Sequence, residues 1–555
     1  MEWGIYPAAA DRLLSFIGIA VHWTILQYVV GLPLLAFVAE LLYLKTGDQK
    51  WLKIAKTLVK GFIIVFAVGA ATGTASEFGL VLLWPNLTQA AGNYIYFPLY
   101  AEVFAFLMEV VFIYMLWYGW EKLPKKVHVI VMLFALIGPW FSAAMIVSVN
   151  SYMVAPTGLE PAYNPATGQW LFDQGYPKLL LAVPTDYANI LNVTLLQQLG
   201  MEVVGQNGGV VLVKMPARII ERLVYEAWHG YTVQDSILKL VIKPEYLNQD
   251  VLNTPVIAIL DAILKATVNY VGVTTVTFKS PVYLGSILHV IGSAITVSSF
   301  TVLAAYAMRK LQLRQKGVKN GEYYEYVDTF FKFAAIFALV AIVLQGTVFG
   351  HLMGTEIAEY NPEKFAAMEG TSQSIFSISR AFGLEKLMAF LGYGSFNAHL
   401  PNYDEIPKDY CVCSVTHDQD LARIGDCRPP LFLHYVYYTK IGLAILSGLF
   451  VLGVAYYLFV KKTELPEILL KLALPFAIII QAVSWMGWVV REVGRKPWTI
   501  YGVMTPDVAR TFNPAPTSLV ALVAVFFIVI LGILAYAVWK FLWLPGKEEV
   551  GMEVS

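Results

Sequence analysis

The chain has 555 residues and a formal net charge of +0, and 58% of its residues are hydrophobic while only 14% are charged. Soluble domains carry about 25% charged residues, so this composition excludes a water-soluble globular protein, and its hydrophobicity excludes a disordered chain. The lack of net basic charge argues against nucleic acid as a partner. The sequence therefore predicts an integral membrane protein whose membrane part is all-α.

Apolar runs of about 20 residues or more predict membrane-spanning helices. The sequence contains about nine: Leu13–Leu42, Leu58–Leu83, Phe97–Trp117, Val127–Met153, Val282–Met308, Phe330–Leu352, Leu431–Val460, Ile468–Val490 and Leu519–Leu542. The first is not expected to be a signal peptide, because its apolar run is too long, lacks a basic leader and contains His22.

Lysine and arginine cluster in the connections that follow the first, third, fifth and seventh runs, whereas the loop Trp84–Tyr96 has neither. Positive residues favour the cytoplasmic side of a membrane. We therefore predict a multi-pass protein of the cell membrane with its N-terminus outside and its C-terminus, including a tail over 546–555, in the cytoplasm.

Two connections on the predicted outer side are long. The segment 159–280, between the fourth and fifth spans, contains the strand-like stretch Gly209–Met215 and the amphipathic stretch Ala217–Trp228. It is predicted to form an inserted external domain of mixed α and β structure. The second long connection covers 354–430, and the remaining membrane parts are 1–158, 281–353 and 431–545.

The second outer connection contains all three cysteines, Cys411, Cys413 and Cys427. Outside the membrane, a disulfide between Cys427 and one of the other two is plausible. Free thiols are the alternative. A zinc site is disfavoured, because this spacing does not match the usual arrangement of zinc ligands.

Two histidines lie inside predicted spans, His22 in the first and His289 in the fifth. Neutral imidazole coordinates iron and other metals well. Each histidine could instead hydrogen-bond to a neighbouring helix. Small residues on both sides of His289, such as Gly285 and Gly292, would allow close helix packing or leave room for a flat macrocycle.

Two carboxylates, Glu102 and Glu109, share one face of the third span, because seven residues make nearly two helical turns, about 10 Å along the axis. A charged group at the centre of a bilayer costs about 2.5–3.5 kcal/mol on insertion scales. The pair therefore suits a proton relay or a cation path, and the alternative is two structural carboxylates. Glu77, toward the outer end of the second span, reads as interfacial.

A basic stretch follows the eighth span and includes Arg491, Arg495 and Lys496. Basic residues at an outer interface run against the positive-inside tendency. An anionic partner such as haem propionates could hold them there through charge-assisted hydrogen bonds. A plain interfacial loop is the alternative.

Taken together, these residues resemble subunit I of the cytochrome bd-type quinol oxidases. Two motifs are specific, Pro362-Glu-Lys-Phe-Ala-Ala-Met-Glu369 in the second outer connection and Gly494-Arg-Lys-Pro-Trp498 after the eighth span. His22, Thr72-Gly73 with Glu77, Glu102, Glu109, Gly119-Trp120 and His289 stand in the family's order around them. The likeness covers the whole membrane part.

The resemblance implies a terminal oxidase that oxidises membrane quinol at the outer face and reduces O2 to water. Subunits of this family carry a low-spin haem b and two high-spin haems, b and d. They normally pair with a second multi-span membrane subunit. The exact haem complement of this chain stays open, as does the choice between haem b and haem d.

The resemblance also implies roles for single residues. His289 matches the ligand of the low-spin haem and His22 that of a high-spin haem, while Arg495 and Trp498 match the haem-side motif. Glu102 and Glu109 match the acidic residues of the oxygen site and its proton path. Lys364 and Glu369 match the pair that contacts the quinol head group.

Several positions depart from the family pattern. Gly442 stands where the family has the methionine that is the second ligand of the low-spin haem, and His434 lies more than two turns earlier. Trp485 stands where the family has a glutamate ligand. The segment 159–279 is longer than usual. These losses leave open a second reading, a catalytically degenerate paralogous partner subunit; a proton or cation transporter is the least favoured.

Overall fold

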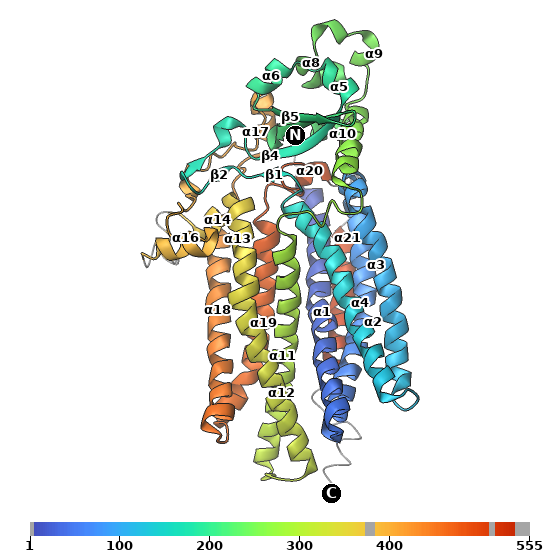
Figure 1. Cartoon of the computed structure of the whole chain (residues 1–555), viewed down its shortest axis with the longest axis vertical. Coiled ribbons are helices and arrows are strands. Elements are labelled where there is room, and N and C mark those ends of the chain that lie inside the picture. The colour runs from blue at the N-terminus through green and yellow to red at the C-terminus, as the bar shows by residue number, and fades with distance from the viewer. Residues whose placement is uncertain (1–4, 372–373, 375–382, 510–516, 539–555) are drawn as a thin grey trace.

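The computed structural model describes residues 5–371, 374, 383–509 and 517–538. Within these ranges, eight helices are long and apolar enough to cross a membrane. They form an elongated bundle with a mixed α/β domain at one end (Figure 1). The spanning elements are α1 (Ile5–Thr46), α2 (Gln49–Leu83), α3 (Pro85–Gly119), α4 (Lys125–Val154), α11 (Tyr283–Gln315), α12 (Glu322–Leu344) with α13 (Gly350–Tyr360), α18 (Phe432–Ala455) and α19 (Glu467–Val493).

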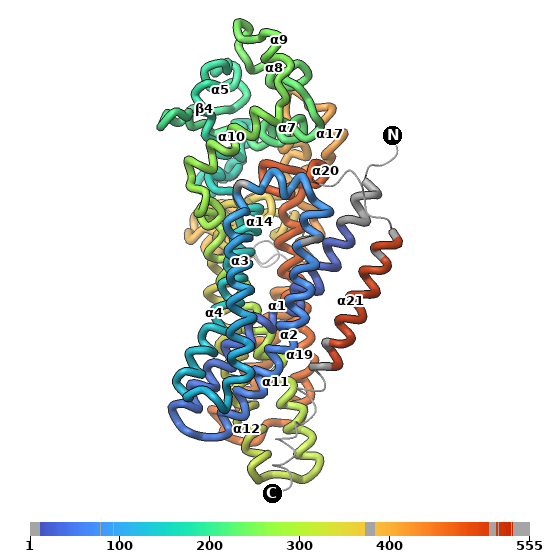
Figure 2. The backbone as a smooth tube through the Cα atoms, turned by 90° about the vertical axis from the view of Figure 1, so that its right-hand side faces the viewer, coloured from blue at the N-terminus to red at the C-terminus, as the bar shows by residue number. Residues whose placement is uncertain are grey.

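The ninth predicted span corresponds to α21 (Thr517–Val538). This helix packs against α1 and α2 at the edge of the bundle, as Figure 2 shows. Residues 539–542 of the prediction lie outside the described residues, as does the predicted tail 546–555. All-α membrane architecture is thus confirmed.

Most spans extend beyond their predicted bounds, and two of them, the third and the sixth, show how. α3 begins at Pro85, so the predicted loop Trp84–Tyr96 is wrong and most of it is helix. Proline at the first helical position needs no hydrogen-bond acceptor for an N–H, which favours this start, and Leu87 and Tyr94 are buried against the external domain. The sixth span continues through a π-helical turn (η4, Gln345–Phe349) into α13 and ends at Tyr360 instead of Leu352.

Small residues bring the helices of the bundle close together. A Cβ atom at Gly31 of α1 would lie 2.3 Å from the carbonyl oxygen of Ala294 in α11, so these two backbones touch. Close approach at small residues drives helix association where lipid removes the hydrophobic force. Large apolar side chains such as Phe104 and Leu449 point outward instead, as expected for surfaces that face lipid or another chain.

The inserted domain is built on an antiparallel sheet of strand order β1-β4-β6-β5. Its strands are β1 (Leu159–Glu160), β4 (Lys178–Pro184), β5 (Glu202–Asn207) and β6 (Val210–Pro216), beside the short hairpin β2 (Tyr163–Asn164) and β3 (Gln169–Trp170). The helices α7 (Ala217–Trp228) and α10 (Val256–Val271) pack together and against the sheet. The predicted strand Gly209–Met215 and helix Ala217–Trp228 are therefore confirmed, and short helices complete the domain: α5 (Thr185–Ile190), α6 (Val193–Gln198), α8 (Leu238–Val241) and α9 (Gln249–Leu252).

The second outer connection contains α14 (Pro362–Glu369), α16 (Glu385–Tyr393) and α17 (His417–Ile424). A disulfide joins Cys411 to Cys427, which confirms a bridge from Cys427, and Cys413 is a buried free thiol. The four lysine- and arginine-bearing connections lie at the end of the bundle opposite to these external parts (Figure 1).

Candidate functional site

His22 and its neighbours form the first candidate site, between α1 and α2. The Nδ1 atom of His22 lies 3.1 Å from the hydroxyl oxygen of Thr72. That hydroxyl has a single hydrogen, which it directs to the backbone carbonyls of Val68 and Gly69. With that hydrogen on a backbone carbonyl, the oxygen accepts a hydrogen bond from Nδ1–H of His22, and in this tautomer the Nε2 atom is unprotonated. A histidine fixed in this tautomer by a second group is the form that ligates a metal.

The space around His22 is tight on one side. A Cβ atom at Gly73 would lie 3.0 Å from Cε1 of the His22 ring. The Thr72-Gly73 pair of the sequence thus has two separate uses: the threonine orients the imidazole, and the glycine gives the ring room against α2.

Three acidic side chains of α2 and α3 lie near one another. Glu102 accepts a 3.0 Å hydrogen bond from Ser142 of α4, and Glu77 of α2 lies close enough to interact with the Glu102 carboxyl. Glu109 is buried, and a Cβ atom at Gly138 would lie 2.6 Å from its Cγ atom. The structure therefore brings together the two predicted glutamates and adds Glu77, which sequence reasoning placed at the interface. Carboxyls in such surroundings can hold and pass protons.

His289 of α11 forms the second candidate site, opposite the π-helical turn of the sixth span. Its Nδ1 atom lies 3.2 Å from Nε2 of Gln345, which also donates a 3.1 Å hydrogen bond to the His289 carbonyl oxygen. π-helical turns frequently mark functional sites. Iron ligation through Nε2 of His289 requires a hydrogen on Nδ1. Gln345 can accept a hydrogen bond from Nδ1–H only if its amide oxygen turns toward the ring.

Buried and half-buried cationic side chains form a cluster, two of whose members, Lys440 and Arg491, interact electrostatically with His289. The members of the cluster are Lys364, Lys440, Arg491, Arg495 and Lys496. Arg491 donates to Asn150, Ser286 and Ser151, which are all neutral. Arg495 donates a 2.6 Å bond to Glu492, while its Nε and Nη1 atoms are buried without a hydrogen-bond partner. The surplus of positive charge and the unpaired guanidinium atoms suit an anionic group.

The two sequence motifs meet in space on this cationic cluster. Lys364 of α14 is buried against Gly494, where an added Cβ atom would lie 2.7 Å from Cε of the lysine. Burial, helped by nearby Arg491, lowers the pKa of Lys364 to about 7. Glu369, at the other end of α14, accepts a 2.8 Å hydrogen bond from Tyr438 of α18. Lys364 and Glu369 thus face different neighbours, although both are buried.

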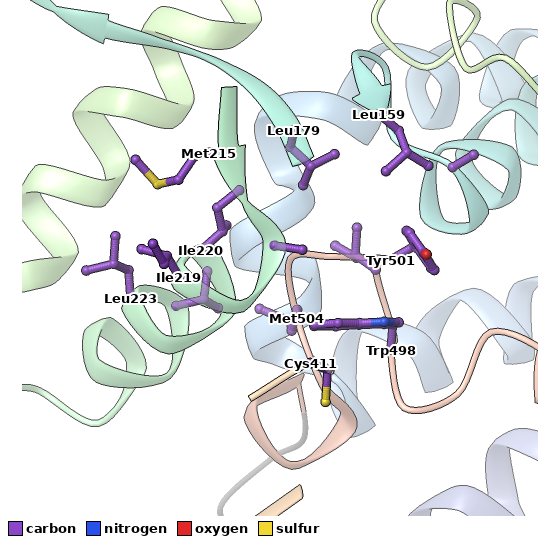
Figure 3. Close-up of a cluster of buried hydrophobic side chains, with 14 of the residues drawn as sticks. Leu159, Leu179, Met215, Ile219, Ile220, Leu223, Cys411, Trp498, Tyr501 and Met504 are labelled. Carbon is purple, nitrogen blue, oxygen red and sulfur yellow. The ribbon is translucent and has the colours of Figure 1, made fainter. Parts of the chain in front are cut away.

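Trp498 lies apart from the two histidines, in the apolar core under the inserted domain. Figure 3 shows its indole beside Met504 and Tyr501, close to Cys411. It is 1% exposed, and this position makes it part of the contact between the helix bundle and the inserted domain. Its predicted cofactor role stays a prediction.

The positions that depart from the family pattern differ in their surroundings. A side chain at Gly442 would meet nothing within 4 Å, so α18 borders open space there. His434 is buried, and its Nδ1 atom lies 2.9 Å from the carbonyl oxygen of Met368, which places it against α14. Trp485 donates a 3.0 Å hydrogen bond to Thr24 of α1, two residues beyond His22.

Comparison with known proteins supports the same reading. The family model described as cytochrome bd terminal oxidase subunit I matches residues 11–173 and 252–548. The stretch 174–251, which runs from β4 almost to the end of α9, lies outside the match and makes up most of the inserted domain.

Two curated relatives come from Bacillus subtilis (strain 168). A candidate cytochrome bd menaquinol oxidase subunit I is 23% identical over 532 residues, which are 92% of this chain and 89% of the relative. A cytochrome bd ubiquinol oxidase subunit 1 is 21% identical over 515 residues, with 90% of this chain and 84% of the relative covered.

Among solved structures, bd oxidase from Geobacillus thermodenitrificans matches the fold with a TM-score of 0.64 at 20% sequence identity. The match covers 96% of this chain and 98% of that one. Because the family model matches most of the sequence and the fold agrees over nearly its whole length, this chain belongs to the cytochrome bd terminal oxidase subunit I family of membrane quinol oxidases.

Proposed function

We propose that this chain is the haem-carrying subunit of a terminal quinol:oxygen oxidoreductase of the cell membrane. It oxidises membrane quinol near its outer face and reduces O2 to water with protons taken from the inside. Its N-terminus lies outside and its C-terminus in the cytoplasm, and a second multi-span subunit completes the enzyme. The observation that carries the proposal is the tautomer of His22, which leaves Nε2 unprotonated toward a ligand.

The residues present fit haem in both candidate sites, with one adjustment. His22 would hold a high-spin haem, b or d, and His289 would hold the low-spin haem b once Gln345 presents its amide oxygen to Nδ1. Bound haem would supply the redox centre that accepts electrons and reduces O2. Arg495, with two unpaired N–H positions, would hold propionates.

The other side chains of the proposed site handle substrate and protons. Lys364 and Glu369, both buried on α14, would contact the quinol head group and accept its protons. Glu102 and Glu109 would deliver protons to the oxygen site, because they lie on one face of α3 and Glu102 interacts with Glu77 of α2. The low pKa of Lys364, about 7, suits an amine that exchanges protons near neutral pH.

The proposal is tested by purifying the complex and measuring its haem content and quinol-dependent oxygen uptake. The His289→Ala variant is expected to lose the low-spin haem signal from the reduced-minus-oxidised spectrum. His351→Ala is the matched control, because His351 lies exposed on α13 in the same membrane region. An unchanged spectrum in His289→Ala would refute the assignment of this ligand.

A second candidate function is a catalytically degenerate paralogous subunit that pairs with an active chain. It is favoured by the open space at Gly442 and by Trp485, whose indole is already bonded to Thr24. This reading predicts a complex that oxidises quinol but keeps its full haem signal when both His22 and His289 of this chain are changed to alanine.

A further inference from the structure

Glu363, the second residue of α14, is a buried carboxyl in the second outer connection, which we call the quinol loop. Sequence reasoning did not single out this residue. Its side chain is 1% exposed. The Oε2 atom accepts a 2.8 Å hydrogen bond from the hydroxyl of Tyr501, while the Oε1 atom is buried without a hydrogen-bond partner. A buried polar atom without a partner destabilises the fold, so the position of Oε1 calls for an explanation.

The surroundings of Glu363 are apolar and aromatic. The hydroxyls of Tyr501, Tyr410 and Tyr393 interact electrostatically with its carboxyl. Tyr501 lies in the segment after α19, Tyr410 precedes the disulfide-bonded Cys411, and Tyr393 is the last residue of α16. Burial raises the pKa of Glu363 to about 7, and the hydrogen bond from Tyr501 opposes the rise. The carboxyl therefore changes charge in the physiological range.

The neighbouring residue faces a different part of the molecule. Lys364 contacts the end of α19, where its Nζ atom lies 3.5 Å from the carbonyl oxygen of Arg491. Consecutive residues on a helix point about 100° apart. Glu363 thus faces the core under the inserted domain, while Lys364 faces the membrane end of the cationic cluster. With pKa values that are both about 7, the two groups are matched for proton exchange.

We propose that Glu363 is the proton-exit group of the quinol loop. Glu363 follows Lys364 in the path of the protons and releases them toward the outer face past Tyr501 and Tyr410. The inference rests on the proposed function. When one quinol is oxidised to quinone, both of its O–H bonds break, two electrons pass to the redox centre of the oxidase, and the two protons are bound one after the other at Oε1 of Glu363. Each proton then leaves Oε1 for water on the external side, which restores the carboxylate.

The test compares Glu363→Gln with the wild-type complex in quinol-dependent oxygen uptake between pH 5 and 9. Glutamine can still accept the hydrogen bond from Tyr501, so the fold and the haem spectrum should persist. Turnover should fall at least about tenfold. Because the carboxyl must be deprotonated to accept a proton, the wild-type rate should rise with pH through about 7, and the variant should lack this rise.

Three further variants separate a proton-carrying role from a structural one. Glu363→Asp keeps a carboxyl and should recover part of the turnover. Tyr501→Phe removes the bond that lowers the pKa of Glu363, so the rise should move to higher pH. Glu359→Gln, an exposed carboxyl on α13, is the matched control and should behave as wild type.

The two proposals fail in different ways. A wild-type complex without quinol-dependent oxygen uptake would overturn the proposed function together with this inference. An active wild type whose Glu363→Gln variant keeps both its turnover and its pH profile would overturn the role of Glu363 alone.

Discussion

Arg423 of α17 holds Glu221 of α7 through two hydrogen bonds of 2.7 Å, one from each terminal nitrogen of the guanidinium. The glutamate is almost fully buried, with a side-chain exposure of 1%. Arg423 also bonds to Asp420 and Asp507 at 3.0 Å. The pair therefore links the inserted domain with the second outer connection and with the segment after α19.

Loss of this link should destabilise the docking of the inserted domain. Arg423→Ala leaves the buried carboxylate of Glu221 without its cation, and breaking a buried pair in this way costs about 3–5 kcal/mol. Thermal unfolding of the purified complex and limited proteolysis of residues 159–280 measure the effect. Lys265→Ala, which breaks an exposed pair with Asp261, should change stability by less than about 1 kcal/mol. Equal behaviour of the two variants would contradict a clamping role.

The hydroxyl of Thr72 should control iron ligation by His22. Thr72→Val removes the acceptor for Nδ1–H while preserving the shape of the side chain, so the imidazole loses its fixed tautomer. Loss of such a supporting group typically costs about 10–100-fold in metal affinity. We expect weaker retention of the high-spin haem, measured by spectral titration after haem extraction. Thr74→Val should have no effect, because Thr74 is exposed and lies two residues along α2, on the opposite side of the helix.

Quinol oxidation should depend on both ends of α14. Lys364→Ala and Glu369→Ala are each expected to slow quinol-dependent oxygen uptake at least about tenfold while bound haem stays unchanged. Tyr438→Phe removes the hydrogen bond to Glu369 and should have a smaller effect. Wild-type turnover in both alanine variants would show that quinol is oxidised elsewhere.

Proton delivery should depend on the space that Gly138 leaves for the side chain of Glu109. Gly138→Ala would place a Cβ atom 2.6 Å from Cγ of Glu109 and so displace the carboxyl. We expect slower oxygen reduction without loss of haem, and Glu109→Gln should give a similar defect. Gly79→Ala on α2, where a Cβ atom meets nothing within 4 Å, is the control. The comparison requires steady-state oxygen uptake and an absorption spectrum for each variant.

Reduction of the Cys411–Cys427 disulfide should loosen the outer connection. The bridge spans 16 residues of sequence, and closing a loop of this size stabilises a fold by about 3 kcal/mol in the chain-entropy description. A Cys411→Ser, Cys427→Ser double variant is expected to unfold at a lower temperature. Cys413→Ser, which removes the buried free thiol, controls for loss of a sulfur atom; no shift in the double variant would contradict the prediction.

The sequence identified many residues of the candidate site, but it could not predict which of them are in contact. The predicted row of Glu102 and Glu109 lies on one face of α3, since helical periodicity is a local property. The role of Thr72 in orienting His22, and the approach of Glu77 to Glu102, depend on how α1, α2 and α3 pack. Glu363 was missed because a glutamate after proline reads as a solvated first turn, whereas here it is buried and Tyr501, Tyr410 and Tyr393 surround its carboxyl.

The amino-acid sequence alone determined that this chain spans a membrane many times, because the length and apolarity of each run decide its partition into lipid. It also determined the secondary structure around Gly209–Trp228, since alternation and amphipathic spacing are local signals. Only the tertiary structure decided which polar groups meet: His22 with Thr72, Glu363 with Tyr501, and Arg423 with Glu221. These partners lie far apart in the chain, and their pairing depends on the free energy of the whole packed assembly.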